Sequence, residues 1–313
     1  MIMNTNENTS GANGAGEPKI STAHPHLFEV TAAYLDRSLE ERVRYAHEDK
    51  FILHAKARVA LSAMKDIYNR PKNLARPACL AVIANSNEGK TTVTNRFHKD
   101  LGGEAACVLG VHDEMPVVLV EMPARATEPR VCLAIARALG LTAYGSAVKS
   151  RMVSDNVMRA LVTKKVQILM LSEFQHVSPI PKFERQVVYD LIKGISNHGI
   201  SIVAIGTQEA KVCLAEDEQV ANRMRIVSLT SFALNQEFRD FLHSLEYYYP
   251  LPMPSGLGTT DMAKEIYGRT NGITGEVVAF CNAAAVYAMR KKLPCIDMAV
   301  VKASSLLPAA NAA

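Results

Sequence analysis

The stretch from Cys79 to Phe97 constrains the fold of this chain more than any other. It begins with six apolar residues (79–84), continues through a turn of small and polar residues, and enters Gly-Lys-Thr-Thr at Gly89. A strand that leads through such a turn into a helix directs several backbone N–H groups, and the positive end of the helix dipole, at one point. This arrangement suits a polyanion, so the sequence predicts a phosphate-binding loop.

The residue types in this loop predict how it holds a nucleotide. Lys90 is placed to reach the β- and γ-phosphates, Thr91 to ligate Mg²⁺, and Gly89 to let the backbone approach closely. The first position of the motif, usually glycine, is Ala84, whose Cβ is tolerated only at negative φ. Gly-Lys-Thr also occurs by chance in loops, but the flanking strand and helix favour nucleotide binding. The expected nucleotide-binding residues are Asn85, Ser86, Asn87, Glu88, Gly89, Lys90, Thr91 and Thr92.

Composition sets broad limits on the class of protein. The chain has 313 residues, of which 48% are hydrophobic, and a net charge of +4. This is enough for one large or two ordinary domains, and it permits contact with nucleic acid without demanding it. The six cysteines form no C-x-x-C pair, which predicts free thiols in a reducing cytoplasm. No apolar run approaches the roughly 20 residues of a membrane span, so we expect a cytoplasmic protein.

Continuous apolar runs recur at 115–123, 166–173 and 199–207, and within 218–229 an Arg-x-Arg pair enters a fifth, short strand. Runs without polar alternation are typical of strands buried on both faces of a parallel sheet. With the run at 79–84 they predict an α/β fold with a five-stranded parallel sheet. The expected organisation is a disordered tail (1–22), a helical lead-in (23–75), a nucleotide-binding domain (76–232) and a helical C-terminal domain (233–313).

The strand at 166–173 ends in Ser172 and Glu173. In phosphate-loop proteins this tip normally carries an Asp for the Mg²⁺ shell, followed in hydrolysing classes by a Glu that orients the attacking water. Ser172 can hydrogen-bond a metal-bound water but supplies no charge, so we expect a metal site of Thr91 and Ser172 with weak affinity or slow turnover. The alternative is a shifted register in which Glu173 itself serves Mg²⁺.

Two further residues are candidates for the same chemistry. Thr207 ends the strand at 199–207, where a polar group can contact the γ-phosphate. Arg223 enters the last strand, and an arginine at a subunit boundary can stabilise charge on a neighbour's γ-phosphate. Arg225 is a weaker candidate, and a plain surface cation is the alternative. The expected catalytic residues are therefore Glu173, Thr207 and Arg223.

Beyond Phe232 the strands stop and four helical segments follow, at 237–248, 261–269, 275–291 and 296–306. The segment 275–291 carries an apolar face formed by Val277, Phe280, Cys281, Ala284 and Tyr287, which predicts the core of this helical domain. Its size suits the lid of an AAA+ ATPase, which closes over the nucleotide.

Taken in order, these features resemble the TniB family of transposition ATPases, relatives of TnsC. The resemblance covers roughly residues 46–304. Its motifs are Asn69-Arg-Pro ahead of Arg76-Pro, Asn85-Ser-Asn-Glu-Gly-Lys-Thr, Val120-Glu-Met-Pro, Gly206-Thr-Gln-Glu-Ala, Ala221-Asn-Arg-Met, Leu251-Pro-Met-Pro-Ser and Thr270-Asn-Gly-Ile-Thr-Gly-Glu. The combination with the lid motif is more specific than the phosphate loop alone.

The resemblance implies an AAA+ regulator of DNA transposition that binds ATP and Mg²⁺. Such a protein assembles on double-stranded target DNA as a ring or helical filament and recruits a DDE transposase, here a TniA-like one, with a TniQ-like targeting factor as a further partner. It also implies the roles given above for Lys90, Thr91, Glu173, Thr207 and Arg223. The candidate DNA contacts, chosen by position, are Arg125, Thr127, Lys149 and Arg151, with a solvated cationic loop as the alternative.

Three features bear on hydrolysis. Ala84 replaces the glycine usual in the family, and Ser172-Glu173-Phe174-Gln175 replaces the usual Asp-Glu-x-His. Gly275-Glu276 looks normal for the family and leaves no arginine at the usual sensor position of the lid. These features concern hydrolysis more than binding. Two alternatives therefore stay open, namely a helicase-loader-like DNA remodeller and a non-hydrolysing adaptor clamped by nucleotide.

Overall fold

The computed structural model describes residues 18–70, 77–101, 114–141 and 150–303. Five parallel strands form a single sheet in the order β2-β3-β4-β1-β5. Their bounds are β1 (Cys79–Ala84), β2 (Val117–Glu121), β3 (Ile168–Ser172), β4 (Ser201–Gly206) and β5 (Met224–Leu229). The α/β fold with a five-stranded parallel sheet is therefore confirmed.

Alternate residues of each strand enter separate hydrophobic clusters on the two faces of the sheet. In β1, Cys79, Ala81 and Ile83 face one cluster, and Leu80, Val82 and Ala84 face the other. Because both faces are covered, every position in this strand is buried and none needs to be polar. This explains why the central runs of the sequence are continuously apolar.

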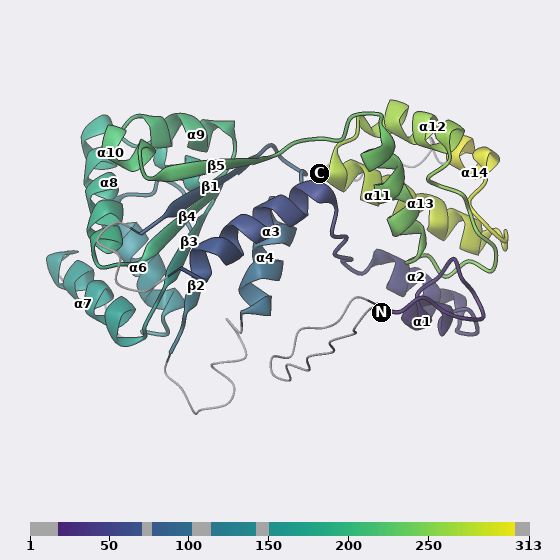
Figure 1. The fold of residues 1–313 in the computed structure, drawn as a ribbon, viewed down its shortest axis with the longest axis horizontal. Helices are drawn as coiled ribbons and strands as arrows, with labels where there is room; N and C mark the ends of the chain where they lie inside the picture. Colours follow the sequence, from purple (N-terminus) through teal and green to yellow (C-terminus); the bar gives the residue numbers. More distant parts are fainter. Residues whose placement is uncertain (1–17, 71–76, 102–113, 142–149, 304–313) are drawn as a thin grey trace, which may run out of the picture.

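Helices cover both faces of the sheet (Figure 1). One face carries α3 (Ala55–Tyr68) and α4 (Lys90–Asp100), whose apolar residues share the cluster of Leu80. The other face carries helices that contribute to the cluster of Ala81. These are α6 (Glu128–Ala138), α7 (Ser150–Thr163), α8 (Lys182–Asn197), α9 (Gln208–Ala215) and α10 (Glu218–Ala221). The short helix α9 was not expected from the sequence, from which we predicted only the strand that ends before it.

The C-terminal helices form a separate body with its own core (Figure 1). They are α11 (Gln236–Glu246), α12 (Thr260–Thr270), α13 (Thr274–Arg290) and α14 (Met298–Ala303). Val277, Cys281 and Ala284 of α13 are almost fully buried in this core, and Phe280 and Tyr287 pack against it. The apolar face expected from the sequence is thus the core of this body, which we call the lid.

No single helix in the described part of the chain has the length and apolar composition of a membrane span. Helices α12 and α13 reach the required length and composition only as a pair, and the pair is bent by 115°.

The N-terminal segment packs on the lid rather than on the sheet. Phe28 stacks on Tyr247 with ring centroids 4.9 Å apart, and α2 (Leu39–His47) places Ala46 in the lid core. A capping box between Ser38 and Glu41 begins α2, which follows the one-turn helix α1 (Glu29–Ala32). The helical lead-in expected at 23–75 is therefore divided, with α1 and α2 on the lid and α3 on the sheet.

The described chain is already held in place before the expected end of the tail at residue 22. Ile20 forms an antiparallel bridge with Phe28, and the N–H of Ser21 donates to the carbonyl of Leu27 at 2.8 Å. The rest of that tail, residues 1–17, lies outside the described residues.

Two connections join the body around the sheet to the lid, one at residues 48–54 and the other at 230–235. At the second connection the N–H of Phe232 donates to the carbonyl of Gly272 at 2.8 Å. Gly272 has a φ of +68°, and a Cβ at this position would lie 2.3 Å from the carbonyl oxygen of Phe232. Only glycine allows this close backbone contact.

We therefore expect Gly272→Ala to lower the free energy of unfolding by about 3 kcal/mol, from backbone strain combined with the clash. Urea denaturation followed by circular dichroism measures the change. Gly268→Ala is the matched control, because it lies in α12 with open space around its Cβ position. That variant is expected to be neutral or more stable by up to about 1 kcal/mol. Equal losses in both variants would contradict the role of the close contact.

Candidate nucleotide-binding site

The phosphate-binding loop connects β1 to α4 in the geometry expected for anion binding. Gly89 has a φ of +83° and α4 begins at Lys90, so the first turn of the helix opens toward the end of β1. Ala84 is fully buried and pairs with Leu229, and its φ is not positive. The Cβ of Ala84 is thus accommodated in an ordinary strand, as the sequence argument requires.

Lys90 folds back onto the loop. Its Nζ donates to the carbonyl oxygens of Ala84 at 3.0 Å and Asn85 at 2.7 Å. Burial lowers the pKa of Lys90, while the nearby carboxylates of Glu173 and Glu88 act in the opposite direction. The ammonium group therefore lies at the centre of the loop, held by two neutral carbonyls that phosphate oxygens would outcompete as acceptors.

The lid meets the loop directly. The N–H of Gly275, in the first turn of α13, donates to the carbonyl of Asn87 at 2.7 Å, and Asn87 Nδ2 donates to Glu276 Oε1 at 2.9 Å. A Cβ on Gly275 would lie 3.0 Å from the same carbonyl oxygen. Gly275-Glu276, which leaves no arginine at the usual sensor position of the lid, is thus a contact between the lid and the loop.

A pocket of about 290 Å³ adjoins the loop between the two bodies. It is lined by Gly89, Thr92 and Val93 from the start of α4, by 48–52 and His54 from the first connection, and by Phe241, Thr274, Gly275, Val278, Ala279 and Asn282 from the lid. A mainly apolar pocket with a few polar groups beside a phosphate loop suits a nucleoside. Sequence reasoning missed it because its walls come from three separate segments.

His54 is the most perturbed titratable group of this pocket. Its ring lies 5.2 Å from that of Phe232 and 5.7 Å from that of Phe241, and its side chain accepts the N–H of Ala57. Burial, with a smaller contribution from Lys56, lowers the pKa of His54 to about 4. The imidazole is therefore neutral at physiological pH and begins α3 as its N-cap.

The strand tips bring Glu173 and Thr207 together through Gln175. Gln175 Nε2 donates to Glu173 Oε2, and Gln175 Oε1 accepts the backbone N–H of Thr207 at 3.2 Å. Gly206 leaves room for this bridge, since a Cβ there would lie 2.7 Å from Gln175 Oε1. Glu173 itself has a φ of +55°, which turns the chain sharply at the end of β3. Gln175 was noted in the sequence only as a departure from the family pattern.

Ser172 lies on the face of the sheet that carries α4, since it alternates with Met170 of that face. Its hydroxyl donates to the carbonyl of Val120 at 3.3 Å. Glu121 is the register partner of Ser172 on β2 and is exposed. A carboxylate therefore lies on the strand next to β3, where Ser172 stands in place of the usual Asp. Sequence reasoning did not consider Glu121 for this purpose, because strand register is not readable from the sequence.

The residues present fit a magnesium ion shared with phosphates. Mg²⁺ prefers oxygen ligands and usually takes only one or two from the protein, with phosphates and waters supplying the rest. Thr91 and Ser172 offer neutral hydroxyls, Glu121 ends β2 beside Ser172, and Glu173 directly follows the end of β3. Within the described ranges no group of three His, Cys, Asp or Glu side chains is placed to hold a metal ion without such help.

Arg223 lies at the amino end of β5, at the opposite edge of the sheet from the loop. Its carbonyl accepts the N–H of Cys79 at 3.4 Å, and its Nη1 donates to Asn197 Oδ1 at 3.1 Å. The side chain therefore lies away from the phosphate site of its own chain. Arg225 is exposed on β5.

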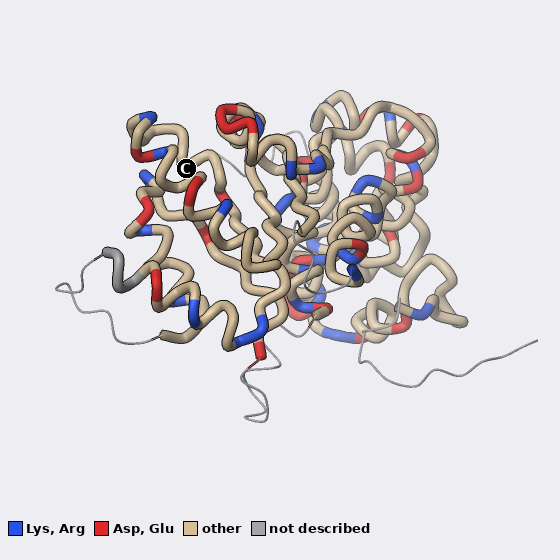
Figure 2. Tube along the Cα trace, turned by 60° about the vertical axis from the view of Figure 1, so that its left-hand side comes forward, with Lys and Arg blue, Asp and Glu red and all other residues tan. Residues whose placement is uncertain are grey.

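The candidate DNA contacts are only partly described. Arg125 is exposed in a turn after β2 with a φ of +54°, and Thr127 precedes α6. Lys149 lies outside the described residues, and Arg151 belongs to α7 but its side chain does not form part of the description. Basic and acidic residues are interspersed in the view of Figure 2.

The turn of Arg125 is fastened to the segment that follows Glu173. The N–H of Ala126 donates to the carbonyl of His176 at 3.1 Å, and His176 Nδ1 lies 2.8 Å from the carbonyl oxygen of Met122. His176 belongs to the short 3₁₀ helix η1 (Phe174–Val177), which begins directly after Glu173. These hydrogen bonds join the turn to the segment that directly follows the tip of β3.

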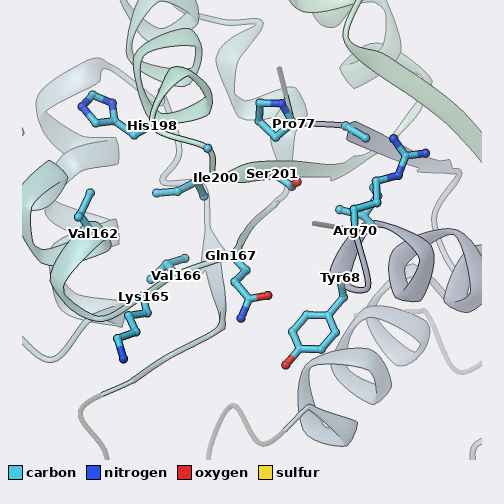
Figure 3. Close-up of a pocket in the computed structure, with 13 residues that line it drawn as sticks. Tyr68, Arg70, Pro77, Val162, Lys165, Val166, Gln167, His198, Ile200 and Ser201 are labelled. Carbon is cyan, nitrogen blue, oxygen red and sulfur yellow. The ribbon is translucent and has the colours of Figure 1, made fainter. Parts of the chain in front are cut away.

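A second cavity, of about 260 Å³, lies at the amino ends of the strands (Figure 3). Its walls include Tyr68, Arg70, Lys165, His198 and Ser201. Ligands of open parallel sheets bind at the carboxyl ends of the strands, which is the edge of the phosphate loop. This cavity is at the other edge, so we do not assign it to the nucleotide site.

Solved structures similar to this chain share its fold. The ORC1 protein of Aeropyrum pernix, solved in complex with DNA, matches with a TM-score of 0.61 and 19% identity over 84% of this chain and 68% of that one. Cdc6p of Pyrobaculum aerophilum matches with a TM-score of 0.59 and 13% identity over 83% and 69%. At such identities the likeness shows the fold alone, which is that of the P-loop AAA+ ATPases.

Among curated proteins, none matches this chain significantly. The model of the family described as bacterial TniB protein matches residues 42–234, which is more than half of the chain. This range contains the phosphate loop, the five strands and the start of the lid connection. The chain therefore belongs to the TniB family of bacterial proteins.

Proposed function

We propose that this protein is an ATP-dependent regulator of DNA transposition. In this proposal it binds ATP and Mg²⁺, assembles on double-stranded DNA as a ring or helical filament, and recruits or activates a TniA-like DDE transposase, with a TniQ-like targeting factor as a further partner. It acts in the bacterial cytoplasm, on the nucleoid. The observation that carries the proposal is a phosphate loop closed by a lid in a chain of the TniB family.

The loop residues bind and orient the triphosphate. Lys90 exchanges the carbonyls of Ala84 and Asn85 for β- and γ-phosphate oxygens, which are charged and therefore stronger acceptors. The backbone N–H groups at the start of α4 hold the remaining phosphate oxygens, and residues 85–92 surround them. The nucleoside lies in the pocket between α4, His54 and α13. Closure of the lid excludes water from this space.

Hydrolysis, where it occurs, depends on the strand tips. Mg²⁺, when bound by Thr91 and Ser172, neutralises charge on the phosphate oxygens. Glu173 orients the attacking water, and Gln175 holds its carboxylate next to Thr207, which contacts the γ-phosphate. Arg223 is too remote to act within its own chain, so it serves the site of a neighbouring subunit. The sites are then complete only in an assembly.

DNA contact is made through loops rather than a basic face. Arg125 and Thr127 are placed to bind phosphates on one loop, and Lys149 and Arg151 on the other. Because the turn of Arg125 is bonded to His176, DNA bound there acts on the segment that holds Glu173.

The absence of a carboxylate at Ser172 favours a second candidate, a non-hydrolysing adaptor clamped by nucleotide. A helicase-loader-like remodeller would instead need rapid hydrolysis stimulated by DNA. Steady-state ATP hydrolysis with and without duplex DNA separates the three functions. Slow ATP hydrolysis would support the regulator of transposition. No hydrolysis would support the adaptor, and fast hydrolysis stimulated by DNA would support the remodeller.

Replacement of Lys90 by Ala is expected to weaken ATP binding by about a hundredfold, because a charge-assisted contact to phosphate is lost. The variant should also form no rings or filaments on duplex DNA with a non-hydrolysable ATP analogue, as seen by electron microscopy. Lys99→Ala, on the exposed side of the same helix, is the control and should behave like the parent. Assembly of the Lys90→Ala protein on DNA, with or without nucleotide, would refute the proposed function.

A double-mutant cycle of Ser172 and Glu121 tests whether the carboxylate of Glu121 takes part in binding Mg²⁺. Ser172→Asp is expected to lower the half-saturating Mg²⁺ concentration for binding a fluorescent ATP analogue by about tenfold, because it adds a charge to the metal shell. Glu121→Gln should raise that concentration about tenfold in the parent, but much less in the Ser172→Asp background. If Glu121→Gln leaves the Mg²⁺ dependence unchanged in both backgrounds, Glu121 does not serve the metal.

Simultaneous replacement of Arg125, Thr127, Lys149 and Arg151 by Ala removes three positive charges. We expect the slope of log K against log salt for duplex DNA to become shallower by about 2 to 3, since each phosphate contact contributes about 0.9. The control variant removes three exposed lysines elsewhere, Lys182, Lys211 and Lys264, and should keep the slope of the parent. An unchanged slope in the quadruple variant would exclude these loops as the DNA contact.

A further inference from the structure

Glu88 belongs to the phosphate loop, but the chemistry described above gives its buried carboxylate no role. Its side chain is almost fully enclosed, with 5% exposure, at a loop position that needs only a backbone N–H for phosphate binding. A charged group removed from water is unfavourable unless its oxygens are hydrogen-bonded. The two partners of this carboxylate therefore indicate its purpose.

Those partners belong to two different parts of the molecule. Oε2 accepts the N–H of Asn85 in the phosphate loop at 2.7 Å, and Oε1 accepts the N–H of Ser231 at 2.9 Å. Ser231 lies in the connection that leads from β5 into the lid. One side chain thus ties the loop to the start of the lid, and each of its oxygens has one donor.

On the loop side, Asn85 is held at both its N–H and its carbonyl. Its N–H binds Glu88, and its carbonyl accepts Lys90 Nζ at 2.7 Å. When Lys90 turns to phosphate it releases this carbonyl, while the N–H of Asn85 stays bonded to Glu88. Glu88 is bonded to the same residue and therefore follows the change.

On the lid side, the bond to Ser231 is adjacent to the first contact of the lid core. Phe232 donates its N–H to the carbonyl of Gly272, and its ring lies 4.7 Å from that of Phe241. Two residues after Gly272, α13 begins and returns to the loop through the bond of Gly275 to Asn87. Ser231 thus directly precedes the residue through which this connection contacts the lid.

We propose that Glu88 is a positioning residue that couples the occupancy of the phosphate loop to the angle of the lid. The coupling runs from Lys90 through Asn85 and Glu88 to Ser231. It rests on the proposed function in one respect, namely that the loop binds a nucleotide. A carboxylate is required, because an amide has one acceptor oxygen and its NH₂ group would face the N–H of the other partner.

The same connection has a second attachment that serves as a control. Lys56, on α3, donates through Nζ to the carbonyls of Thr230 at 3.0 Å and Ser231 at 2.8 Å. It fastens the connection to the body around the sheet, and within the described structure its hydrogen bonds go to Thr230 and Ser231 rather than to the phosphate loop. A variant at Lys56 therefore loosens the connection without interrupting the proposed coupling.

The test is hydrogen exchange in the full chain, with and without a non-hydrolysable ATP analogue, read on peptides that cover 228–234 and 271–278. In the parent, nucleotide is expected to slow exchange in both peptides. Glu88→Gln, read at an analogue concentration that saturates it, should lose most of the nucleotide-dependent protection. Lys56→Met should exchange faster at 228–234 in both states and keep the nucleotide-dependent difference. Glu88→Asp is too short to reach both donors and should behave like Glu88→Gln. It is the test variant to use if Glu88→Gln does not fold.

The coupling would be overturned if Glu88→Gln kept the nucleotide-dependent protection of the parent, or if Lys56→Met lost as much of it as Glu88→Gln. Glu88 would then only stabilise the connection. Loss of nucleotide binding in both Glu88→Gln and Glu88→Asp would also overturn the coupling, because Glu88 would then be needed only for the structure of the phosphate loop. These outcomes leave the proposed function intact, since the parent still binds nucleotide. A parent that binds no ATP analogue would overturn the proposed function and this coupling together.

Discussion

The parallel alignment of the five strands is the constraint on which the rest of this structure depends. It places the ends of β1, β3 and β4 at one edge of the sheet, so the loop of Lys90, the tip at Ser172 and Glu173, and Thr207 meet there. Residues separated by more than 100 positions in the chain become neighbours through backbone hydrogen bonds alone. The two faces of the sheet must then be covered by helices, and one of these, α4, supplies the N-terminus that faces the phosphates.

Around this edge the polar side chains form bridges rather than isolated contacts. Gln175 joins Glu173 to the backbone of Thr207, His176 joins the segment after Glu173 to the turn of Arg125, and Glu88 joins the loop to the lid connection. Each bridge crosses from one structural element to another. In the proposed function, these bridges connect the phosphate site to the proposed DNA loop and to the lid.

The sequence predicts the sheet and the phosphate loop well, because burial on both faces leaves a continuous apolar run and the loop has a fixed residue pattern. It predicts which face of α13 is buried, since the 3.6-residue period shows it. It does not show that α2 packs on the lid while α3 packs on the sheet, because an amphipathic period gives the buried face and not its partner. The pocket between 48–54 and α13 and the pairing of Glu121 with Ser172 depend on tertiary contacts and register, so only the structure reveals them.

The division of the N-terminal segment has a mechanical consequence. Because α2 belongs to the lid and α3 to the body around the sheet, the chain passes between the two bodies twice, at 48–54 and at 230–235. A domain that is attached through one chain segment can rotate in any direction relative to its neighbour. Attachment through two segments restricts this rotation. The lid of this protein is thus attached through two chain segments, and the first of them, at 48–54, also forms a wall of the pocket beside the phosphate loop.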